Sequence, residues 1–426
     1  MILIDKAYCA YESEPFLHAF GFKGSTLSGA WQTVVALTSG GEVGIGLGIQ
    51  SVLWSDGSVF AEFGEDRSNE LMFAVTQYAV KAIAGREFSS VPDIVHSVFD
   101  ECYAYAKRIV GRENVTETFV LNALVPLDMA AWQLFARLGG AADFDGIYRG
   151  HGKATRIANI PLITYGVPAE EVVRMAEDGV CLFKIKIGSD PDKDGDLDKM
   201  LAWDKARAGE IHALLKDIKT PFTESGHVVY YFDANGRYDT KERLMDLLSH
   251  LEREGILRRT ILFEEPFAPE NEIYVGDLPC CFAADESAHS LKDVKRRIEL
   301  GFGAITLKPI AKTPSVTIEM ASCADAAGVQ CFCADLTVNP LMVEWNKNFA
   351  ARLKPLRGMK IGVVESNGGQ NYKNWEEMKS YIPRKGTESD ATVYTLGEEF
   401  YTAGGGLFEL SEHYLALVKA QNPDFI

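Results

Sequence analysis

The sequence predicts an α/β protein: a TIM-type (β/α) barrel preceded by a smaller α+β domain. Eight apolar, strand-like runs alternate with helix-like segments between about residues 160 and 365. The first 150 residues instead place strands before helices, which indicates a separate α+β layer. Ionisable residues directly follow most of the eight runs, at the barrel end where active sites lie in this architecture. A doubly wound open sheet is the competing interpretation of the same alternation.

The composition is that of a globular chain and argues against several classes of partner. The chain has 426 residues, 47% of them hydrophobic, which is enough for a large core and two domains. Its formal net charge of −17 argues against nucleic acid or an anionic membrane as a partner. No uninterrupted apolar run approaches the roughly 20 residues that span a bilayer, and the N-terminus lacks a signal-peptide pattern. The eight cysteines form no Cys-x-x-Cys pair, so free thiols in a cytoplasmic protein are expected.

Residues 1–150 are expected to form the α+β domain. Strand-like runs at 31–37 and 43–49 are joined by Ser39-Gly40-Gly41, a hairpin signal. The glycines at 44, 46 and 48 lack the G-x-G-x-x-G spacing and a following helix, so nucleotide binding is not predicted. Amphipathic helices are expected at 69–83, 91–110 and 118–138.

The segment 15–28 is expected to be a loop, and it is unusually aromatic for a connection. Its residues can serve either as packing for the first domain or as a lid that contacts substrate. Phe20 and Lys23 are therefore candidate substrate contacts.

Barrel strands are expected at 160–164, 182–187, 228–232, 260–263, 280–284, 304–307, 329–333 and 361–364. Capping residues bracket three of the helices between them: Thr240 and Gly255, Ser290 and Gly301, and Thr313-Pro314 and Gly328. After about residue 375 the chain turns polar and then aromatic, and we expect it to pack back on the first domain. The predicted divisions are 1–150, 151–375 and 376–426.

The second barrel strand carries two lysines, Lys184 and Lys186, in alternation with apolar residues. Period 2 places both on one face, near the C-terminal end of a largely buried strand. Two crowded lysines in a partly dry place are expected to depress each other's pKa, which would make a general base near neutral pH. A solvated strand face is the alternative.

Acidic residues end the next three strands: Asp233, Glu264 and Asp285. Their carboxylates are the hard oxygen ligands that Mg²⁺ prefers, and without a cation they would repel one another. Lys308 ends the sixth strand, across the barrel mouth from Lys186. A metal flanked by two lysines suits removal of a proton α to a carboxylate, with the ion stabilising the enediolate. A salt-bridged barrel rim is the alternative.

Further polar groups after the third, fourth, fifth, seventh and eighth strands are candidate substrate or supporting residues: Asn235, Glu265, Glu286, Asp335, Glu365 and Asn367.

The order Lys-x-Lys, Asp-x-Asn, Glu-Glu-Pro, Ala-Asp-Glu-Ser and a lone Lys resembles the enolase superfamily. Within it, the pattern is most similar to the muconate lactonizing enzyme subgroup of the mandelate racemase/muconate lactonizing enzyme family. The stretch 127–132, Leu-Asp-Met-Ala-Ala-Trp, resembles the helix that precedes the barrel in that family, and 41–46 resembles its N-terminal hairpin.

The resemblance implies a modified, (β/α)7β-like barrel under an α+β capping domain built from both termini. It implies one Mg²⁺ on Asp233, Glu264 and Asp285, with Lys186 and Lys308 as opposed acid/base groups. Lys184 would tune Lys186 and touch the substrate carboxylate. Family members assemble, so a homo-oligomer is implied.

The chain departs from the family pattern in two places. An insertion at 189–227 begins with Asp190-x-Asp192-x-Asp194-Gly195, but Leu201 at position 12 argues against an EF-hand and for a solvated acidic loop. The seventh strand has no His for a His–Asp dyad, so Asp335 would orient Lys308, while Glu365 or Asn367 would contact substrate.

Together these features predict a Mg²⁺-dependent enzyme that removes the proton α to the carboxylate of a small acid, as a racemase or epimerase. The same site permits a lyase reaction by β-elimination, as in a sugar-acid dehydratase, or cycloisomerisation. A non-catalytic barrel that binds metal or carboxylate is the rival from another class. The identity of the substrate is left open.

Overall fold

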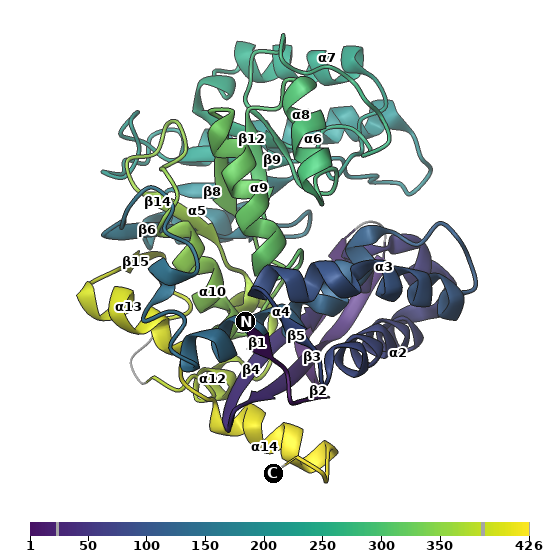
Figure 1. The fold of residues 1–426 in the computed structure, drawn as a ribbon. Coiled ribbons are helices and arrows are strands. Elements are labelled where there is room, and N and C mark those ends of the chain that lie inside the picture. Colours follow the sequence, from purple (N-terminus) through teal and green to yellow (C-terminus); the bar gives the residue numbers. More distant parts are fainter. Residues whose placement is uncertain (23–24, 385–387, 426) are drawn as a thin grey trace.

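The computed structural model describes residues 1–22, 25–384 and 388–425. Figure 1 shows the barrel strands with their helices, in teal and green, beside an N-terminal group of strands and helices in purple and blue. The yellow C-terminal helix lies against the N-terminal group. The predicted fold class is confirmed.

The barrel contains eight parallel strand positions, and the ring closes on itself. The first position is one strand broken at Pro161, which has no N–H to donate; β6 pairs with β14, and β7 pairs with β8. The strands are β6 (Arg156–Ile160), β7 (Leu162–Ile163), β8 (Leu182–Lys186), β9 (Val229–Asp233), β10 (Thr260–Glu264), β11 (Phe282–Ala284), β12 (Ala304–Leu307), β13 (Gln330–Cys333) and β14 (Gly362–Glu365).

Helices follow most of these strands. They are α5 (Ala169–Glu177), α6 (Leu197–Leu215), α7 (Lys241–Arg253), α8 (Leu291–Glu299), α9 (Pro314–Ala326) and α10 (Pro340–Ala350). The predicted N-caps are confirmed: Thr240, Ser290 and Thr313 each accept a hydrogen bond from a backbone N–H of the first turn. Within the described residues no helix separates β10 from β11, and only the short α11 (Gly368–Asn371) and α12 (Trp375–Lys379) follow β14 directly. The barrel is therefore modified, as expected.

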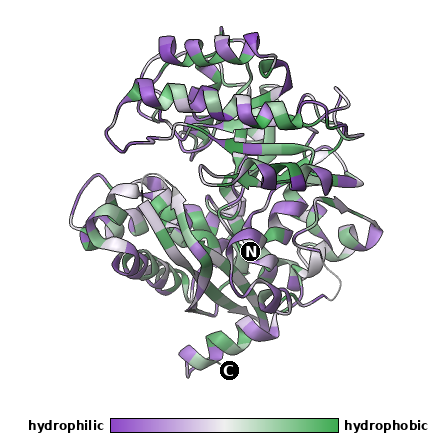
Figure 2. Ribbon diagram, turned by 180° about the vertical axis from the view of Figure 1, so that it is seen from behind, coloured by the Kyte–Doolittle hydropathy of each residue, from purple (hydrophilic) through white to green (hydrophobic). Residues whose placement is uncertain are grey.

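Each barrel strand is buried on both faces. One face fills the barrel interior with residues such as Leu182, Tyr231 and Phe332, which form a separate apolar cluster. The other face, including Phe183 and Ile185, packs into the core beneath the helices. Figure 2 shows the same division as hydrophobic strands beneath helices of mixed colour. Because Lys184 and Lys186 alternate with the outward residues, they share the interior face with Leu182.

The N-terminal sheet is antiparallel, in the order β2 (Lys6–Phe22), β3 (Ser25–Ser39) and β4 (Glu42–Gln50). The predicted hairpin at Gly40-Gly41 is confirmed, and both glycines have positive φ, as its turn requires. The prediction of a loop at 15–28 was wrong, because β2 and β3 continue pairing to Phe22 and Ser25 with a register shift between Pro15 and Phe20. Aromatic residues favour strands, and that property outweighed the absence of strict alternation here.

Glycines 44, 46 and 48 on β4 have a packing role. A Cβ on Gly46 would lie 2.1 Å from both the Ala130 nitrogen and the Pro126 oxygen of helix α4 (Glu117–Arg137). Small residues therefore let α4 lie directly on the sheet. By length and composition α4 could span a membrane, but 89% of its apolar window is buried inside the protein.

The N-terminal region contains further elements besides the sheet and α4. They are β1 (Ile2–Leu3), α1 (Val52–Ser55), α2 (Gly57–Ile83), β5 (Glu87–Phe88), α3 (Val91–Val110) and the 3₁₀ turn Phe144–Gly146. The predicted helices are confirmed, although α2 begins earlier than expected and is interrupted at Gly64, whose φ is 74°.

The C-terminal segment divides between the two parts of the molecule. Strand β15 (Val393–Thr395) adds antiparallel to β6 at the barrel, followed by α13 (Glu398–Ala403) and the 3₁₀ turn Gly404–Gly406. Helix α14 (Glu412–Gln421) returns to the N-terminal sheet, where His413 Nε2 lies 2.9 Å from Glu12 Oε1. The expected return is confirmed for α14, while the boundaries at 150 and 375 stay predictions.

The segment 189–227 contains the barrel helix α6 and an exposed acidic loop before it. Asp196 caps α6 by accepting from Asp198 N and Lys199 N, and Lys199 Nζ lies 2.7 Å from Asp192 and 2.6 Å from Asp194. The 3₁₀ turn Leu257–Arg259 precedes β10. All eight cysteines are free thiols.

Candidate active site

The C-terminal strand ends open into one cavity, which the N-terminal domain covers. Phe16, Phe20, Leu27 and Trp54 close it from the N-terminal side. Polar groups from the barrel line the other side: Lys184, Lys186, Asp233, Asn235, Asp285, Glu286, Lys308, Asp335, Glu365 and Asn367. Of the two predicted lid residues, Phe20 therefore lies at the cavity, and Lys23 lies outside the described residues.

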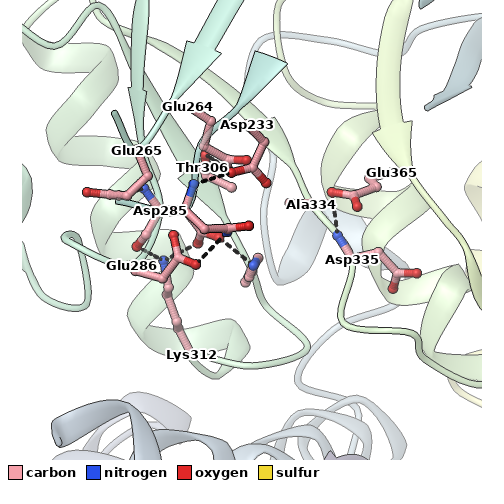
Figure 3. Close-up of polar contacts among 12 residues, drawn as sticks. Asp233, Glu264, Glu265, Asp285, Glu286, Thr306, Lys312, Ala334, Asp335 and Glu365 are labelled. Atoms are coloured by element: carbon pink, nitrogen blue, oxygen red, sulfur yellow. Dashed lines mark hydrogen bonds and ion pairs between the residues drawn. The ribbon is translucent and has the colours of Figure 1, made fainter. Parts of the chain in front are cut away.

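Strand register places the predicted carboxylates in a row. Lys186 on β8 is level with Asp233 on β9, and Asp233 is level with Glu264 on β10. Asp285 directly follows β11, the next strand of the sheet, and Lys308 directly follows β12. Figure 3 shows Asp233, Glu264 and Asp285 gathered at adjoining strand ends. The row therefore has a lysine at each end.

At the first end, Lys186 Nζ lies 2.6 Å from Asp233 Oδ2 and 2.5 Å from Asn235 Oδ1. Burial alone would raise the pKa of Asp233, but the ammonium groups of Lys186 and Lys184 hold it below its usual value. Asn235 has a positive φ of 44° and also donates from Nδ2 to Glu286 Oε1 at 2.9 Å. It therefore links the first end of the row to the loop after β11.

Lys184 lies beneath the row rather than at its rim. Its Nζ is 3.1 Å from Asp233 Oδ2, 2.8 Å from Glu264 Oε2 and 3.2 Å from Glu365 Oε2. Burial would lower the pKa of Lys184, yet these carboxylates raise it well above its usual value. The expected mutual depression is therefore wrong for Lys184, because three carboxylates lie within 3.2 Å of its Nζ.

At the second end, two lysines hold one carboxylate. Lys308 Nζ lies 2.5 Å from Asp285 Oδ2, and Lys312 Nζ lies 3.1 Å from Asp285 Oδ1 and 2.8 Å from the Asp285 carbonyl oxygen. Burial would raise the pKa of Asp285, but the two ammonium groups lower it. Trp54, on α1, places its ring centroid 4.6 Å from Lys308 Nζ.

Glu264, in the middle of the row, is fully buried. Tyr231 donates its hydroxyl to Oε2, and Thr306 donates to Oε1 at 2.9 Å. Burial and the neighbouring Asp233 and Asp285 nevertheless raise the pKa of Glu264 well above its usual value, against the effect of Lys184. The middle of the row is short of positive charge.

Glu265 supports the loop that carries Asp285. Its Oε2 accepts from Asp285 N at 2.7 Å and from Ser287 N and Oγ at 3.2 and 3.0 Å. Burial, and then the charge of Glu286, raise the pKa of Glu265 to about 7. It therefore positions Asp285 rather than facing the cavity.

Asp335 does not orient Lys308, so that expectation was wrong. Its oxygens accept from Asn367 N at 2.7 Å and Val338 N at 3.4 Å, and its own N–H donates to Glu365 Oε2 at 3.2 Å. Burial, and then the charge of Glu365, raise the pKa of Asp335 to about 7. Figure 3 shows Asp335 and Glu365 as a pair apart from Asp285. They join β13 and β14 at the far side of the cavity.

Four residues of the site were not predicted: Tyr231, Thr306, Lys312 and Trp54. The first two were detectable, because Tyr231 precedes Asp233 and Thr306 precedes Lys308 by two positions, on the same strand face. Lys312 reaches Asp285 through an irregular turn, and Trp54 comes from another domain. Neither has a periodic signal.

The residues fit a divalent cation by the chemistry of their donors. Three buried carboxylates from neighbouring strands offer hard oxygen ligands, and the raised pKa of Glu264 marks a place where positive charge is needed. In this structure each carboxylate contacts a lysine Nζ directly: Glu264 contacts Lys184, Asp233 contacts Lys186, and Asp285 contacts Lys308. Within the described residues, no three acidic, His or Cys side chains are already set around a single point. Binding an ion would therefore require Lys186 and Lys308 to move away from Asp233 and Asp285.

No protein-family model and no curated protein sequence matches the chain. Solved structures do match over nearly its full length. N-succinyl Arg/Lys racemase from Bacillus cereus superposes with a TM-score of 0.69 at 15% identity, covering 98% of both chains. The chain has the mandelate racemase/muconate lactonizing enzyme fold.

Two further structures share this fold. One is a dipeptide epimerase from Enterococcus faecalis, solved with Mg and the dipeptide L-Leu-L-Tyr, with a TM-score of 0.66 at 16% identity over 95% of this chain and 99% of that one. The other is the L-Ala-D/L-Glu epimerase from Bacillus subtilis, with a TM-score of 0.67 at 18% identity over 93% and 97%. The comparisons do not single out the muconate lactonizing enzyme subgroup.

Proposed function

We propose that this protein is an isomerase of the enolase superfamily, a racemase or epimerase that inverts the carbon α to the carboxylate of a small acid. The observation that carries the proposal is the row of three buried carboxylates with a cavity-lining lysine at each end. One lysine would remove the α proton, and the other would return a proton to the opposite face. The racemase and epimerases that share the fold support this reaction class.

Asp233, Glu264 and Asp285 would hold one Mg²⁺. When bound, the ion would supply the positive charge that stabilises negative charge developing on the substrate carboxylate. Lys186 and Lys308 would exchange their contacts with Asp233 and Asp285 for contacts with the substrate. Lys184 would stay beneath the row, where its charge offsets part of the acid surplus.

The substrate must fit beneath an apolar cover. Phe16, Phe20, Leu27 and Trp54 line that side of the cavity. We therefore infer an acid with an apolar portion. Dipeptides and N-succinyl amino acids, which the names of three structures with this fold carry, are the first compounds to examine.

The test is solvent-deuterium exchange with Mg²⁺ present, followed by mass spectrometry and ¹H NMR. Each probe is supplied as both α epimers: L-Ala-L-Glu and L-Ala-D-Glu, L-Leu-L-Tyr and L-Leu-D-Tyr, and N-succinyl-L- and D-arginine. Uptake of one deuteron at the α carbon, with interconversion of the epimers, supports the proposal. Exchange without interconversion would indicate the lyase or cycloisomerase alternatives. No exchange across these probes and a wider acid panel, despite bound Mg²⁺, would favour a non-catalytic barrel.

A further inference from the structure

Lys312 is a fully buried lysine that faces the carboxylate row from behind. Its side chain has no exposed surface and it does not line the cavity, whereas Lys308 does. Its Nζ contacts both the carboxylate and the carbonyl oxygen of Asp285, at 3.1 and 2.8 Å. In Figure 3 the Lys312 side chain approaches Asp285 from below, whereas Asp233 and Glu264 lie above Asp285. A buried charge at that position needs a reason, because desolvation disfavours it.

The backbone around Lys312 is held in a costly conformation. Thr313 has φ of 66° and ψ of 147°, a region that β-branched residues rarely adopt. The strain is maintained from two sides: Lys312 N donates to the Lys308 carbonyl at 2.7 Å, and Asp128 of the capping domain accepts from Ser315 N and Oγ, both at 2.7 Å. The fold therefore fixes the turn that delivers the Lys312 side chain to Asp285.

The two lysines divide the oxygens of Asp285 between them. Lys308 takes Oδ2, and Lys312 takes Oδ1. The centroid of the Trp54 ring lies 4.6 Å from Lys308 Nζ and 5.9 Å from Lys312 Nζ, so both cations are close to the same aromatic ring. Lys308 therefore shares its carboxylate partner with a second cation, Lys312, which does not line the cavity.

We propose that Lys312 is the permanent counterion of Asp285, and that it allows Lys308 to leave Asp285 and act on substrate in the cavity. Without Lys312, Asp285 would be a buried carboxylate with Lys308 as its nearest cation, and Lys308 would be bound more tightly. Lys312 is thus a positioning residue that acts through Asp285. The movement assigned to Lys308 rests on the proposed function, but the experiment below needs no substrate, so the two can fail separately.

The experiment is competitive trace acetylation of the metal-free full chain with acetic anhydride, read residue by residue by mass spectrometry. Complete labelling of the unfolded chain with the heavy isotope gives the reference. A lysine reacts only as the neutral amine, after it leaves its carboxylate and loses a proton, so tighter pairing with Asp285 slows the labelling of Lys308. In Lys312→Met, labelling of Lys308 is expected to slow about tenfold, the effect of one strengthened charge-assisted hydrogen bond. Lys186, paired with Asp233, is expected to keep its rate.

Two further variants separate charge from packing. Lys312→Arg keeps the charge and is expected to restore most of the Lys308 rate. Lys347→Met removes another buried lysine, whose Nζ lies 2.7 Å from Glu344 Oε1, and is expected to leave Lys308 unchanged. If Lys312→Met does not fold, Lys312→Gln takes its place. Its amide keeps a donor for the Asp285 carbonyl but carries no charge, so labelling of Lys308 is again expected to slow.

Each outcome either supports or overturns the proposal. Slower labelling of Lys308 with an unchanged Lys186 supports the proposal. A merely structural Lys312 would loosen the site on removal and speed both lysines. An unchanged or faster Lys308, or an equal change at both lysines, overturns it.

Discussion

The two ends of the carboxylate row offer the same pair of groups in different surroundings. At the β8 end, Lys186 is 11% exposed and contacts Asp233 and the amide of Asn235. At the β12 end, Lys308 is 4% exposed and lies under Trp54. The first lysine stands in a polar, accessible place, and the second in a dry place beneath the other domain. If the two act on opposite faces of one carbon, the two directions of the reaction depend on different parts of the molecule.

Removing each lysine separately is the strongest test of this difference between the two ends of the row. Lys186→Ala and Lys308→Ala are each expected to lower α-proton exchange from one stereoisomer by about 100- to 10,000-fold, because each removes one acid/base group. Exchange from the other stereoisomer should survive, since the remaining lysine still faces it. The measurement is deuterium uptake by each epimer separately. If both epimers still exchange at full rate in Lys308→Ala, the hypothesis that Lys186 and Lys308 are the two acid/base groups is wrong.

The next largest effect is expected beneath the row, where both ends depend on Lys184. Lys184→Met would leave Glu264 and Asp233 without their shared cation, and breaking a buried pair in this way costs ~3–5 kcal/mol. Urea denaturation measures the loss of unfolding free energy. Lys199→Met is the matched control, because Lys199 also lies between two carboxylates but at the surface, and it should leave the unfolding free energy nearly unchanged. Equal effects of the two variants would contradict the assigned role of Lys184.

The sequence was informative about these groups wherever a strand placed them. Period 2 located Lys184, Lys186, Asp233 and Lys308, because alternate residues of a strand share a face and parallel strands end together. The family resemblance ranked the two lysines of β8, with Lys186 as the acid/base group and Lys184 as its support, but the pattern did not predict the raised pKa of Lys184. That pKa depends on Glu264 of β10 and Glu365 of β14, which reach Lys184 through the order of the strands in the sheet.

Prediction failed where a residue's role depends on an irregular backbone or another domain. The aromatic segment 15–28 was expected to be a loop, yet β2 and β3 continue their pairing into it through a register shift. Lys312 depends on a strained Thr313, and Trp54 reaches the barrel only after the domains pack. The capping domain therefore supplies both the cover and part of the support of the β12 end.

The third prediction concerns that support and is a dependence of stability on pH. Asp128 is fully buried, and burial raises its pKa from 3.8 to about 7 despite hydrogen bonds from Ser315 and Thr313. Between these values the folded protein keeps a proton that the unfolded chain releases. The stabilisation is therefore complete below about pH 4 and is lost as pH rises through about 7, by up to roughly 4 kcal/mol. Urea midpoints between pH 4 and 8 measure it. Asp128→Asn should reduce this slope, to which Glu265 and Asp335 also contribute, and an unchanged slope would exclude Asp128 as a contributor.

The smallest expected effect comes from the ring above Lys308. Trp54→Leu removes an aromatic face that lies 4.6 Å from Lys308 Nζ, an interaction worth ~1–2 kcal/mol at a desolvated site. Exchange that depends on Lys308 should slow about tenfold, the rate equivalent of that energy. Exchange that depends on Lys186 should be nearly unchanged, because Lys186 lies at the other end of the row. Trp54→Phe keeps a ring and should fall between the two. A uniform loss for both epimers would mean that Trp54 serves only to close the cavity.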